Sequence, residues 1–238
     1  MKVIVEGEYA CFTRPELKVE RVSYDVPTPS ALEGLLKSVY WKPSFRYVID
    51  KVIVFNPIKF ANIRRNEVKE KVKKNSVVSK MKGEDKDLAV YTDKCRTQRA
   101  SSVLKDVRYG ISFHIEMTGL QCESSDEKPE KHLAILERRL KKGQSFRTPC
   151  LGCAEFSARK IELVSAFNYD EICNENKNVD HLDLGFMLYG LHFQDEGRPV
   201  NSNWGMPKFS DLADPVFYRP KMHQGVIDVA KYAAERRC

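Results

Sequence analysis

The sequence predicts an α+β protein with a ferredoxin-like (RRM-like) domain: a four-stranded antiparallel sheet carrying two helices. Stretches rich in β-branched and aromatic residues alternate with two amphipathic stretches in the order strand, helix, strand, strand, helix, strand. The chain has 238 residues, enough for one large domain or for one domain with an appendage. We therefore expect the ferredoxin-like domain over residues 1–164, followed by a small β-rich domain over residues 165–238.

The first helix is predicted from capping residues and from apolar spacing. It follows a strand at residues 2–9 and begins either after Thr28, with Pro29 at the first helical position, or at Ser30. Both starts use residue types that favour helix N-termini. Four apolar residues at helical spacing predict its buried face: Leu32, Leu35, Leu36 and Val39. The helix is expected to end near Tyr40, shortly before the next proline.

Three further strands are predicted at residues 45–55, 103–117 and 150–164, because β-branched and aromatic residues are concentrated there. Residues 64–87 show no clear period, so we expect a long basic loop, and loops of this length are usually functional or disordered. The last part of the chain, residues 165–238, holds turn-forming residues between short apolar runs. This composition predicts the β-rich C-terminal segment.

The second helix opens with Pro129, which suits the first helical position, and ends at Gly143, which suits a left-handed cap. Its apolar face is expected to be Leu133, Leu136 and Leu140. Lys131 and His132 then lie in an exposed first turn, where free backbone N–H groups attract anions. A phosphate bound there would meet a fixed positive charge and an imidazole that can carry a proton. The residues alone leave a second interpretation open, in which both are simply solvated.

Positive charge is concentrated in one segment. The net charge is +7, and residues 64–82 contain eight basic and two acidic residues, which give +6. The basic residues are Arg64, Arg65, Lys69, Lys71, Lys73, Lys74, Lys80 and Lys82. Such a cluster is typical of nucleic-acid binding, although a solvated loop without a partner would have the same composition.

Several classes of function are not supported by the sequence. No apolar run reaches the ~18 residues of a membrane span, and the N-terminus has the pattern of a strand and not of a signal peptide. We therefore expect a cytoplasmic protein with no membrane partner.

The seven cysteines are odd in number and scattered, which argues against a disulfide framework. Cys150 and Cys153 form one C-x-x-C without a second pair, so we expect two small apolar residues on a half-buried strand and no metal. No phosphate-binding glycine motif is present, and no cofactor is expected.

RNA can be cut without a metal ion, because its own 2′-hydroxyl can act as the nucleophile. The enzyme then needs groups that move protons and a cation for the charge that develops on the phosphate. His132 can transfer a proton and Lys131 can stabilise charge. Tyr40 can approach them, since both helices lie on one face of a ferredoxin-like sheet. A phenol normally has a pKa near 10, so Tyr40 would need a neighbouring cation such as Lys131 to act as a base. A tyrosine packed on the core is the alternative.

Nine segments across nearly the whole chain share a pattern with a known family. They are residues 23–28 (SYDVPT), 38–43 (SVYWKP), 56–58 (NPI), 62–68 (NIRRNEV), 98–99 (QR), 104–109 (LKDVRY), 131–132 (KH), 151–153 (LGC) and 184–190 (LGFMLYG). With them the sequence resembles the Cas-five family of CRISPR-associated proteins, Dvulg subtype, which belongs to the RAMP superfamily and to type I-C systems. One departure is Ala154, where members often carry an arginine before the glutamate that is Glu155 here.

The resemblance implies an endoribonuclease that processes CRISPR precursor RNA at its repeat hairpin. It also implies that the protein stays bound as a subunit of the type I-C surveillance complex, beside backbone and large subunits. The family's catalytic residues correspond to Tyr40, Lys131 and His132. The expected RNA-binding residues are Arg64, Arg65, Lys69, Lys71, Lys73, Lys74, Arg96, Arg99, Arg108 and Arg147. Two alternatives stay open: a non-catalytic RNA- or DNA-binding structural subunit, and non-specific duplex DNA binding through the basic segment.

Overall fold

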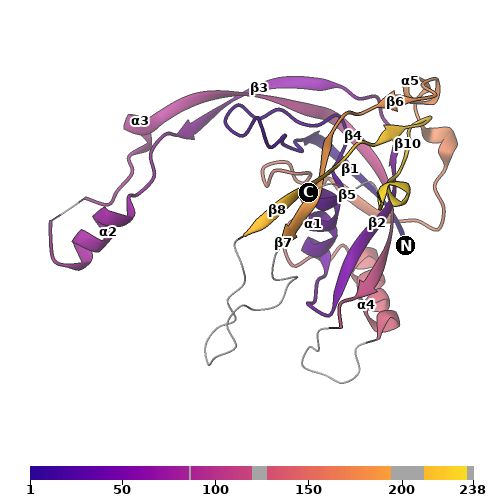
Figure 1. Ribbon diagram of the computed structural model, residues 1–238, viewed down its shortest axis with the longest axis horizontal. Helices are drawn as coiled ribbons and strands as arrows, with labels where there is room; N and C mark the ends of the chain where they lie inside the picture. Colours follow the sequence, from indigo (N-terminus) through magenta and orange to yellow (C-terminus); the bar gives the residue numbers. More distant parts are fainter. Residues whose placement is uncertain (86, 120–127, 194–211, 235–238) are drawn as a thin grey trace.

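An antiparallel sheet forms the centre of the molecule (Figure 1). The structure is a computed structural model that describes residues 1–85, 87–119, 128–193 and 212–234. Within these residues the sheet has six strands, in the order β10-β2-β4-β1-β5, with β3 paired to part of β4. The strands are β1 (Lys2–Ala10), β2 (Phe45–Val54), β3 (Phe60–Val68), β4 (Arg96–Met117), β5 (Lys160–Leu163) and β10 (Val226–Asp228). The mixed α and β composition is as predicted, but β3 and β10 widen the sheet beyond four strands.

Two helices, α1 (Pro29–Val39) and α4 (Pro129–Lys142), pack into the main hydrophobic core. Of the two predicted starts for α1, the structure uses Thr28, whose hydroxyl accepts a hydrogen bond from the Ala31 N–H at 3.3 Å. Helix α4 ends at Gly143, which has a φ of 63°, a conformation that glycine adopts without a steric penalty. Capping and apolar spacing therefore predicted both helices correctly.

The two faces of the sheet carry separate hydrophobic clusters. Side chains alternate between faces along a strand, so Val3 and Val5 of β1 join the helix-covered core while Ile4 faces the other way. On that second face Ile4 belongs to a smaller cluster with Ile53, Phe55, Phe167 and Ile172. Phe167 and Ile172 flank the 3₁₀ turn η1 (Tyr169–Glu171), and the short helix α5 (Asn174–Lys177) follows them.

The C-terminal part is rich in short strands, as predicted. It contains the pairs β7 (Met187–Phe193) with β8 (Ala213–Tyr218) and β6 (Leu182–Asp183) with β9 (Lys221–Met222). Strand β10 pairs with β2, and the 3₁₀ turn η2 (Val229–Tyr232) follows it. Several side chains of this part belong to the same core as α1: Leu184, Met187, Tyr218, Met222 and Ile227. The division into two domains at residue 164 stays a prediction.

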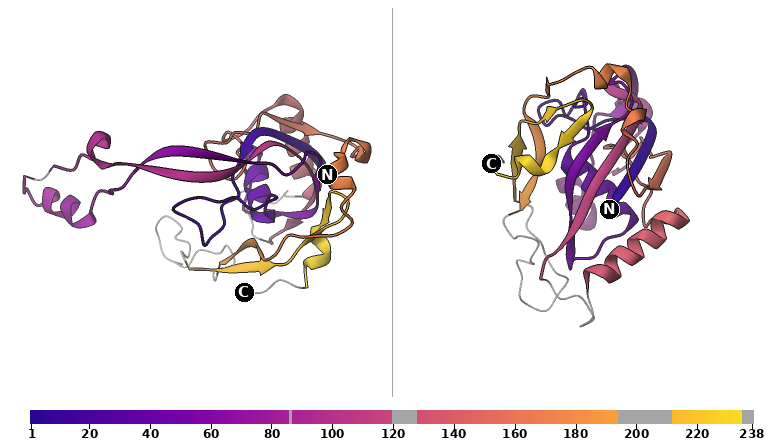
Figure 2. Two further views of the ribbon diagram at one scale, coloured as in Figure 1. Left: turned by 90° about the horizontal axis from the view of Figure 1, so that it is seen from above. Right: turned by 90° about the vertical axis from the view of Figure 1, so that its right-hand side faces the viewer.

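A long two-stranded ribbon extends from the body, formed by β3 and the first part of β4 (Figures 1 and 2). Its strands pair from Phe60 opposite Leu104 to Val68 opposite Arg96. Beyond them lie α2 (Lys74–Met81) and α3 (Thr92–Cys95). We call residues 60–104 the arm. The predicted loop at residues 64–87 is therefore wrong in part, because it contains the end of β3 and the whole of α2.

Two other strand predictions need correction. β4 begins at Arg96, before the predicted residue 103, because its first part pairs with β3 in the arm and does not enter the core. The predicted strand at residues 150–164 is shortened to β5, and only an isolated bridge between Cys150 and Ser157 precedes it. Among the helices described by the structure, none combines the length and the apolar character that crossing a bilayer requires.

Candidate active site and nucleic-acid interface

The ends of α1 and α4 bring together two of the predicted catalytic side chains. Tyr40 caps the C-terminus of α1, where its backbone N–H donates to the Leu36 carbonyl at 3.1 Å. His132 lies in the first turn of α4, 92 residues later in the chain. The Tyr40 hydroxyl is 2.9 Å from His132 Nδ1, a hydrogen-bond distance. We call Tyr40, Lys131 and His132 the helix-end site.

Residues after α1 form the rest of the environment of His132. The Ser44 hydroxyl is 3.4 Å from His132 Nε2, which is a long contact for a hydrogen bond. The Phe45 ring packs on the imidazole with the ring centres 4.8 Å apart. Hydroxyl groups thus lie beside both ring nitrogens of His132, and such partners fix the orientation of a histidine ring and select its tautomer.

The burial of His132 corrects the expected exposed first turn. His132 is only 3% exposed, because it stands four and eight residues before Leu136 and Leu140 and therefore lies on the same buried stripe. Leu133, predicted for that stripe, is half-buried. Lys131 is exposed, since adjacent helix residues point ~100° apart. The structure thus separates the two: the imidazole faces the core and the ammonium faces solvent.

Tyr40 is held from several sides. Its side chain is 4% exposed, and the Tyr47 hydroxyl donates to its backbone carbonyl at 2.6 Å. Arg139 of α4 places its guanidinium carbon 5.0 Å from the centre of the Tyr40 ring. The same guanidinium donates through Nη1 to the Val39 carbonyl at 2.7 Å. Arg139 was not among the predicted site residues, although its position seven residues after His132 places both on one side of the helix.

The arm carries most of the predicted RNA-binding residues, and the structure divides them into two groups. Six of them are exposed: Arg64, Lys69, Lys71, Lys73, Lys74 and Arg96. Arg65 and Arg99, which lie opposite each other in the ribbon, are half-buried on its other face. Arg147 is exposed in the loop after α4, where its backbone N–H donates to the Ser38 carbonyl.

Arg65 is engaged by carboxylates at the base of the arm. Its side chain is 15% exposed and pairs with Glu67 at 3.2 Å and with Glu155. The guanidinium is therefore already neutralised in this structure, in contrast with the exposed side chain of Arg64. Glu155, next to the departure at Ala154, thus has its ion-pair partner in Arg65.

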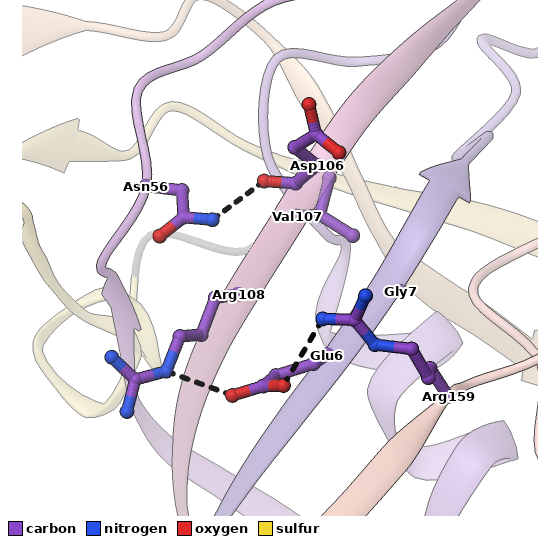
Figure 3. Close-up of a pocket in the computed structure, with 7 residues that line it drawn as sticks. All are labelled: Glu6, Gly7, Asn56, Asp106, Val107, Arg108 and Arg159. Carbon is purple, nitrogen blue, oxygen red and sulfur yellow. Dashed lines mark hydrogen bonds and ion pairs between the residues drawn. The ribbon is translucent and has the colours of Figure 1, made fainter.

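Arg108 is also engaged by acidic groups, on the face of the sheet away from the helices (Figure 3). Its guanidinium pairs with Glu6 at 3.1 Å and with Glu171 at 2.6 Å. It also lies over the Phe55 ring, 4.7 Å from the ring centre. Arg108 and Glu6 border a small cavity of about 120 Å³, which Arg159 and Asn56 also line. Arg108 thus joins β4 to neighbouring elements, and the structure does not bring it near the helix-end site.

The C-x-x-C pair lies beside the base of the arm and not on a regular strand, which corrects the prediction for these residues. Arg21 donates to Cys153 Sγ at 3.3 Å, and the Thr13 hydroxyl is 3.8 Å from the same sulfur. A hydrogen bond with Cys11 lowers the pKa of the Cys153 thiol and raises the pKa of Cys11, and the Thr13 and Arg21 contacts lower that of Cys153 further.

Residues 1–230 match a family model described as CRISPR-associated protein (Cas_Cas5), of the Cas5d type. The chain belongs to the Cas5d family. It is 39% identical over 236 residues to the CRISPR pre-crRNA endoribonuclease Cas5d of Mannheimia succiniciproducens, covering 99% of this chain and 96% of that protein. It is 38% identical over 232 residues to the protein of the same name in Thermus thermophilus, covering 96% and 90%. A solved structure described as a CRISPR-associated protein matches with a TM-score of 0.60 at 27% identity, covering 95% of this chain and 89% of that one. The family resemblance of the sequence is thereby confirmed.

Proposed function

We propose that this protein is an endoribonuclease that cuts CRISPR precursor RNA at its repeat hairpin. The observation that carries the proposal is the contact between the Tyr40 hydroxyl and His132 Nδ1, with the exposed Lys131 beside it in the first turn of α4. A phenol and an imidazole in hydrogen-bond contact can pass a proton between them, and an ammonium can neutralise a phosphate. Relatives that are 38% and 39% identical over almost the whole chain carry the name of this activity.

The reaction uses the 2′-hydroxyl of the nucleotide before the cut. Its oxygen forms a bond to the adjacent phosphorus, the bond from phosphorus to the 5′-oxygen breaks, and a 2′,3′-cyclic phosphate results. The 2′-hydroxyl loses its proton and the departing 5′-oxygen gains one. Tyr40 poises the 2′-hydroxyl, His132 transfers a proton, and Lys131 stabilises the charge on the phosphate.

The burial of the site sets a condition on this mechanism. With Tyr40 4% exposed and His132 3% exposed, only a small part of each residue is open to a ribose before RNA binds. The same burial favours the alternative function, a structural subunit that binds RNA or DNA without cutting it and in which the Tyr40–His132 contact only stabilises the fold. The two functions differ in the outcome of the experiment below.

Binding is assigned to the exposed cations of the arm and to Arg147, which would contact phosphates and supply affinity without reading sequence. Arg99 at the arm base adds to them. Arg65 and Arg108 contribute only if RNA displaces their acidic partners. Non-specific binding of duplex DNA to the arm is an expected side activity. We infer that the protein keeps the cut RNA and joins the backbone and large subunits of a type I-C surveillance complex in the cytoplasm, where the precursor transcript is made.

A ferredoxin-like strand order would also support this function. The order β2-β4-β1-β5 with α1 and α4 in one core is the arrangement expected for a ferredoxin-like, RAMP-type domain. In this arrangement the C-terminus of α1 and the N-terminus of α4 meet beside one face of the sheet. Residues separated by 92 positions in the sequence can therefore act on one phosphate.

The test is cleavage of a repeat hairpin RNA by the purified protein in excess EDTA. We expect products ending in a 2′,3′-cyclic phosphate and a 5′-hydroxyl, identified by mass spectrometry. The matched substrate carries one 2′-deoxy substitution at the nucleotide before the cut, and it should bind equally well but stay intact. Cleavage of the deoxy substrate would exclude 2′-hydroxyl attack. Binding of both RNAs without any cleavage would favour the structural subunit.

A further inference from the structure

We propose that Arg139 is a positioning residue for RNA cleavage, which holds Tyr40 at the end of α1 and places a positive charge against its ring. The inference rests on the proposed function and assigns a residue that the helix-end site does not include. It also changes which cation serves Tyr40. The sequence suggested Lys131 for this task, whereas the structure places the guanidinium of Arg139 against the phenol ring.

The geometry gives Arg139 two simultaneous contacts. One hydrogen bond, donated by Nη1 to the Val39 carbonyl at 2.7 Å, joins α4 to the last residue of α1. The face of the guanidinium meanwhile lies over the ring of Tyr40, with its central carbon 5.0 Å from the ring centre. An arginine can do both because its charge is spread over a planar group with several donors. A lysine at this position would keep the charge but lose the planar fork.

The charge of Arg139 acts on the protonation of Tyr40. The guanidinium carbon lies 5.0 Å from the centre of the Tyr40 ring, and a nearby cation favours the anionic form of an ionisable group, so the inference is that Arg139 helps the Tyr40 hydroxyl to accept a hydrogen bond from the 2′-hydroxyl. The titratable groups that the structure records around Tyr40 include His132 and Arg139 from α4 and Tyr47 from β2. Burial and the nearby Tyr40 raise the pKa of Tyr47, while Arg139 lowers it. Tyr47 therefore stays protonated and donates to the Tyr40 carbonyl.

The experiment compares the wild-type protein with Arg139→Gln, Arg139→Lys and the control Arg138→Gln, which removes an exposed arginine from the neighbouring position of the same helix. Single-turnover cleavage is measured from pH 5 to pH 10 with protein in excess, beside equilibrium RNA binding and thermal unfolding. In parallel, ¹³C NMR of ring-labelled tyrosine follows the titration of the Tyr40 phenol directly, with the Tyr40→Phe protein identifying its signal.

For Arg139→Gln we expect the pH dependence of cleavage and the titration of Tyr40 to move upward by about one pH unit or more, with about tenfold slower cleavage near neutral pH and little change in RNA binding. Arg139→Lys should restore the position of the pH profile, because it keeps the charge. Arg138→Gln should match the wild type. A purely structural Arg139 would change thermal unfolding without moving either titration, and that result would overturn the inference.

The design keeps this inference separate from the proposed function. If Tyr40→Phe cleaves at the wild-type rate, the proposed active site is wrong. If Tyr40→Phe is inactive while Arg139→Gln has the wild-type pH profile and an unchanged Tyr40 titration, the active site stands and only the role of Arg139 fails. Should Arg139→Gln cleave too slowly for a profile, the NMR titration of Tyr40 decides by itself.

Discussion

The arm and the helix-end site use polar residues in opposite ways. In the arm, cations such as Arg64 and Arg96 are exposed on a ribbon that depends on backbone pairing. In the helix-end site, Tyr40 and His132 are almost fully buried and touch through single atoms. Exposed charges act through their number and are screened by salt, whereas a buried contact depends on the identity of each atom. The arm should therefore tolerate single substitutions that the helix-end site cannot.

The largest expected effect comes from the helix-end site. His132→Ala removes the proposed proton carrier and should slow single-turnover cleavage by ~10²–10⁴-fold, the usual contribution of a general acid or base. Tyr40→Phe keeps the ring under Arg139 and deletes only the hydroxyl that contacts His132, so a comparable loss there is chemical. RNA binding should change little in both variants, as measured by equilibrium titration.

Lys131→Ala serves as the internal comparison for these two variants. Its side chain is exposed and charged, so its loss should reduce both the cleavage rate and the affinity for RNA. If all three variants bind and cut like the wild type, the Tyr40–His132 contact only stabilises the fold, and the residues that cut the RNA lie elsewhere in the protein.

The arm gives the next largest effect, and it appears in binding. Four exposed lysines are changed together to glutamine: Lys69, Lys71, Lys73 and Lys74. Loss of four phosphate contacts should lower the slope of log affinity against log salt by about 3, and it should weaken binding to unrelated RNAs to the same extent. Cleavage of saturated RNA should keep its rate, because the helix-end site is untouched.

A matched control removes the same charge from outside the arm. It changes four other exposed lysines to glutamine: Lys18, Lys51, Lys221 and Lys231. The general attraction of a basic protein for RNA falls equally in both sets. If the control changes the salt slope as much as the arm variant does, the arm has no special part in binding.

The same contrast explains what the sequence could predict. Helices α1 and α4 were predicted closely because their apolar residues follow helical spacing. In addition, Thr28 caps the start of α1 and Gly143 caps the end of α4, and both are local signals. The arm was missed because β3 contains five polar or charged residues among its nine and buries none of its side chains, so no hydrophobic period distinguishes it from a loop. Its strands are specified by the pairing of Arg64 with Ala100 and its neighbours, which is a tertiary feature.

Within the site, the sequence predicted which residues are involved but not their burial or their contacts. Tyr40 and His132 were candidates from their helix positions and chemistry, and the family resemblance implied their catalytic role, but the distance between them depends on how two helix ends meet across 92 residues. The burial of His132 did have a signal, its spacing of four and eight residues from Leu136 and Leu140. The prediction placed Leu133 on the buried stripe instead. It assigned residues to the two faces of the helix by their polarity, so it expected His132 to be exposed to solvent.

The smallest expected effect distinguishes two adjacent arginines of the arm. Arg65 is 15% exposed and pairs with Glu67 and Glu155, so Arg65→Ala leaves two carboxylates without their partner at the arm base. Because these carboxylates are 33% and 44% exposed, the cost should be intermediate between surface and buried ion pairs, about 1–2 kcal/mol. For a chain of this size that cost corresponds to a thermal midpoint lower by roughly 2–8 °C.

Arg64 is the neighbour that lacks this burial. Its side chain lies on the exposed face of β3, so Arg64→Ala should change stability by less than ~0.5 kcal/mol but should lower the salt slope of RNA binding by about one phosphate contact. Arg65→Ala should show the reverse pattern, with a lower thermal midpoint and a salt slope near that of the wild type. Thermal unfolding and salt-dependent RNA titration of both variants measure the two effects side by side. Equal salt slopes for the two variants would mean that RNA displaces Glu67 and Glu155 from Arg65, and that the ion pairs at the arm base open when the arm binds.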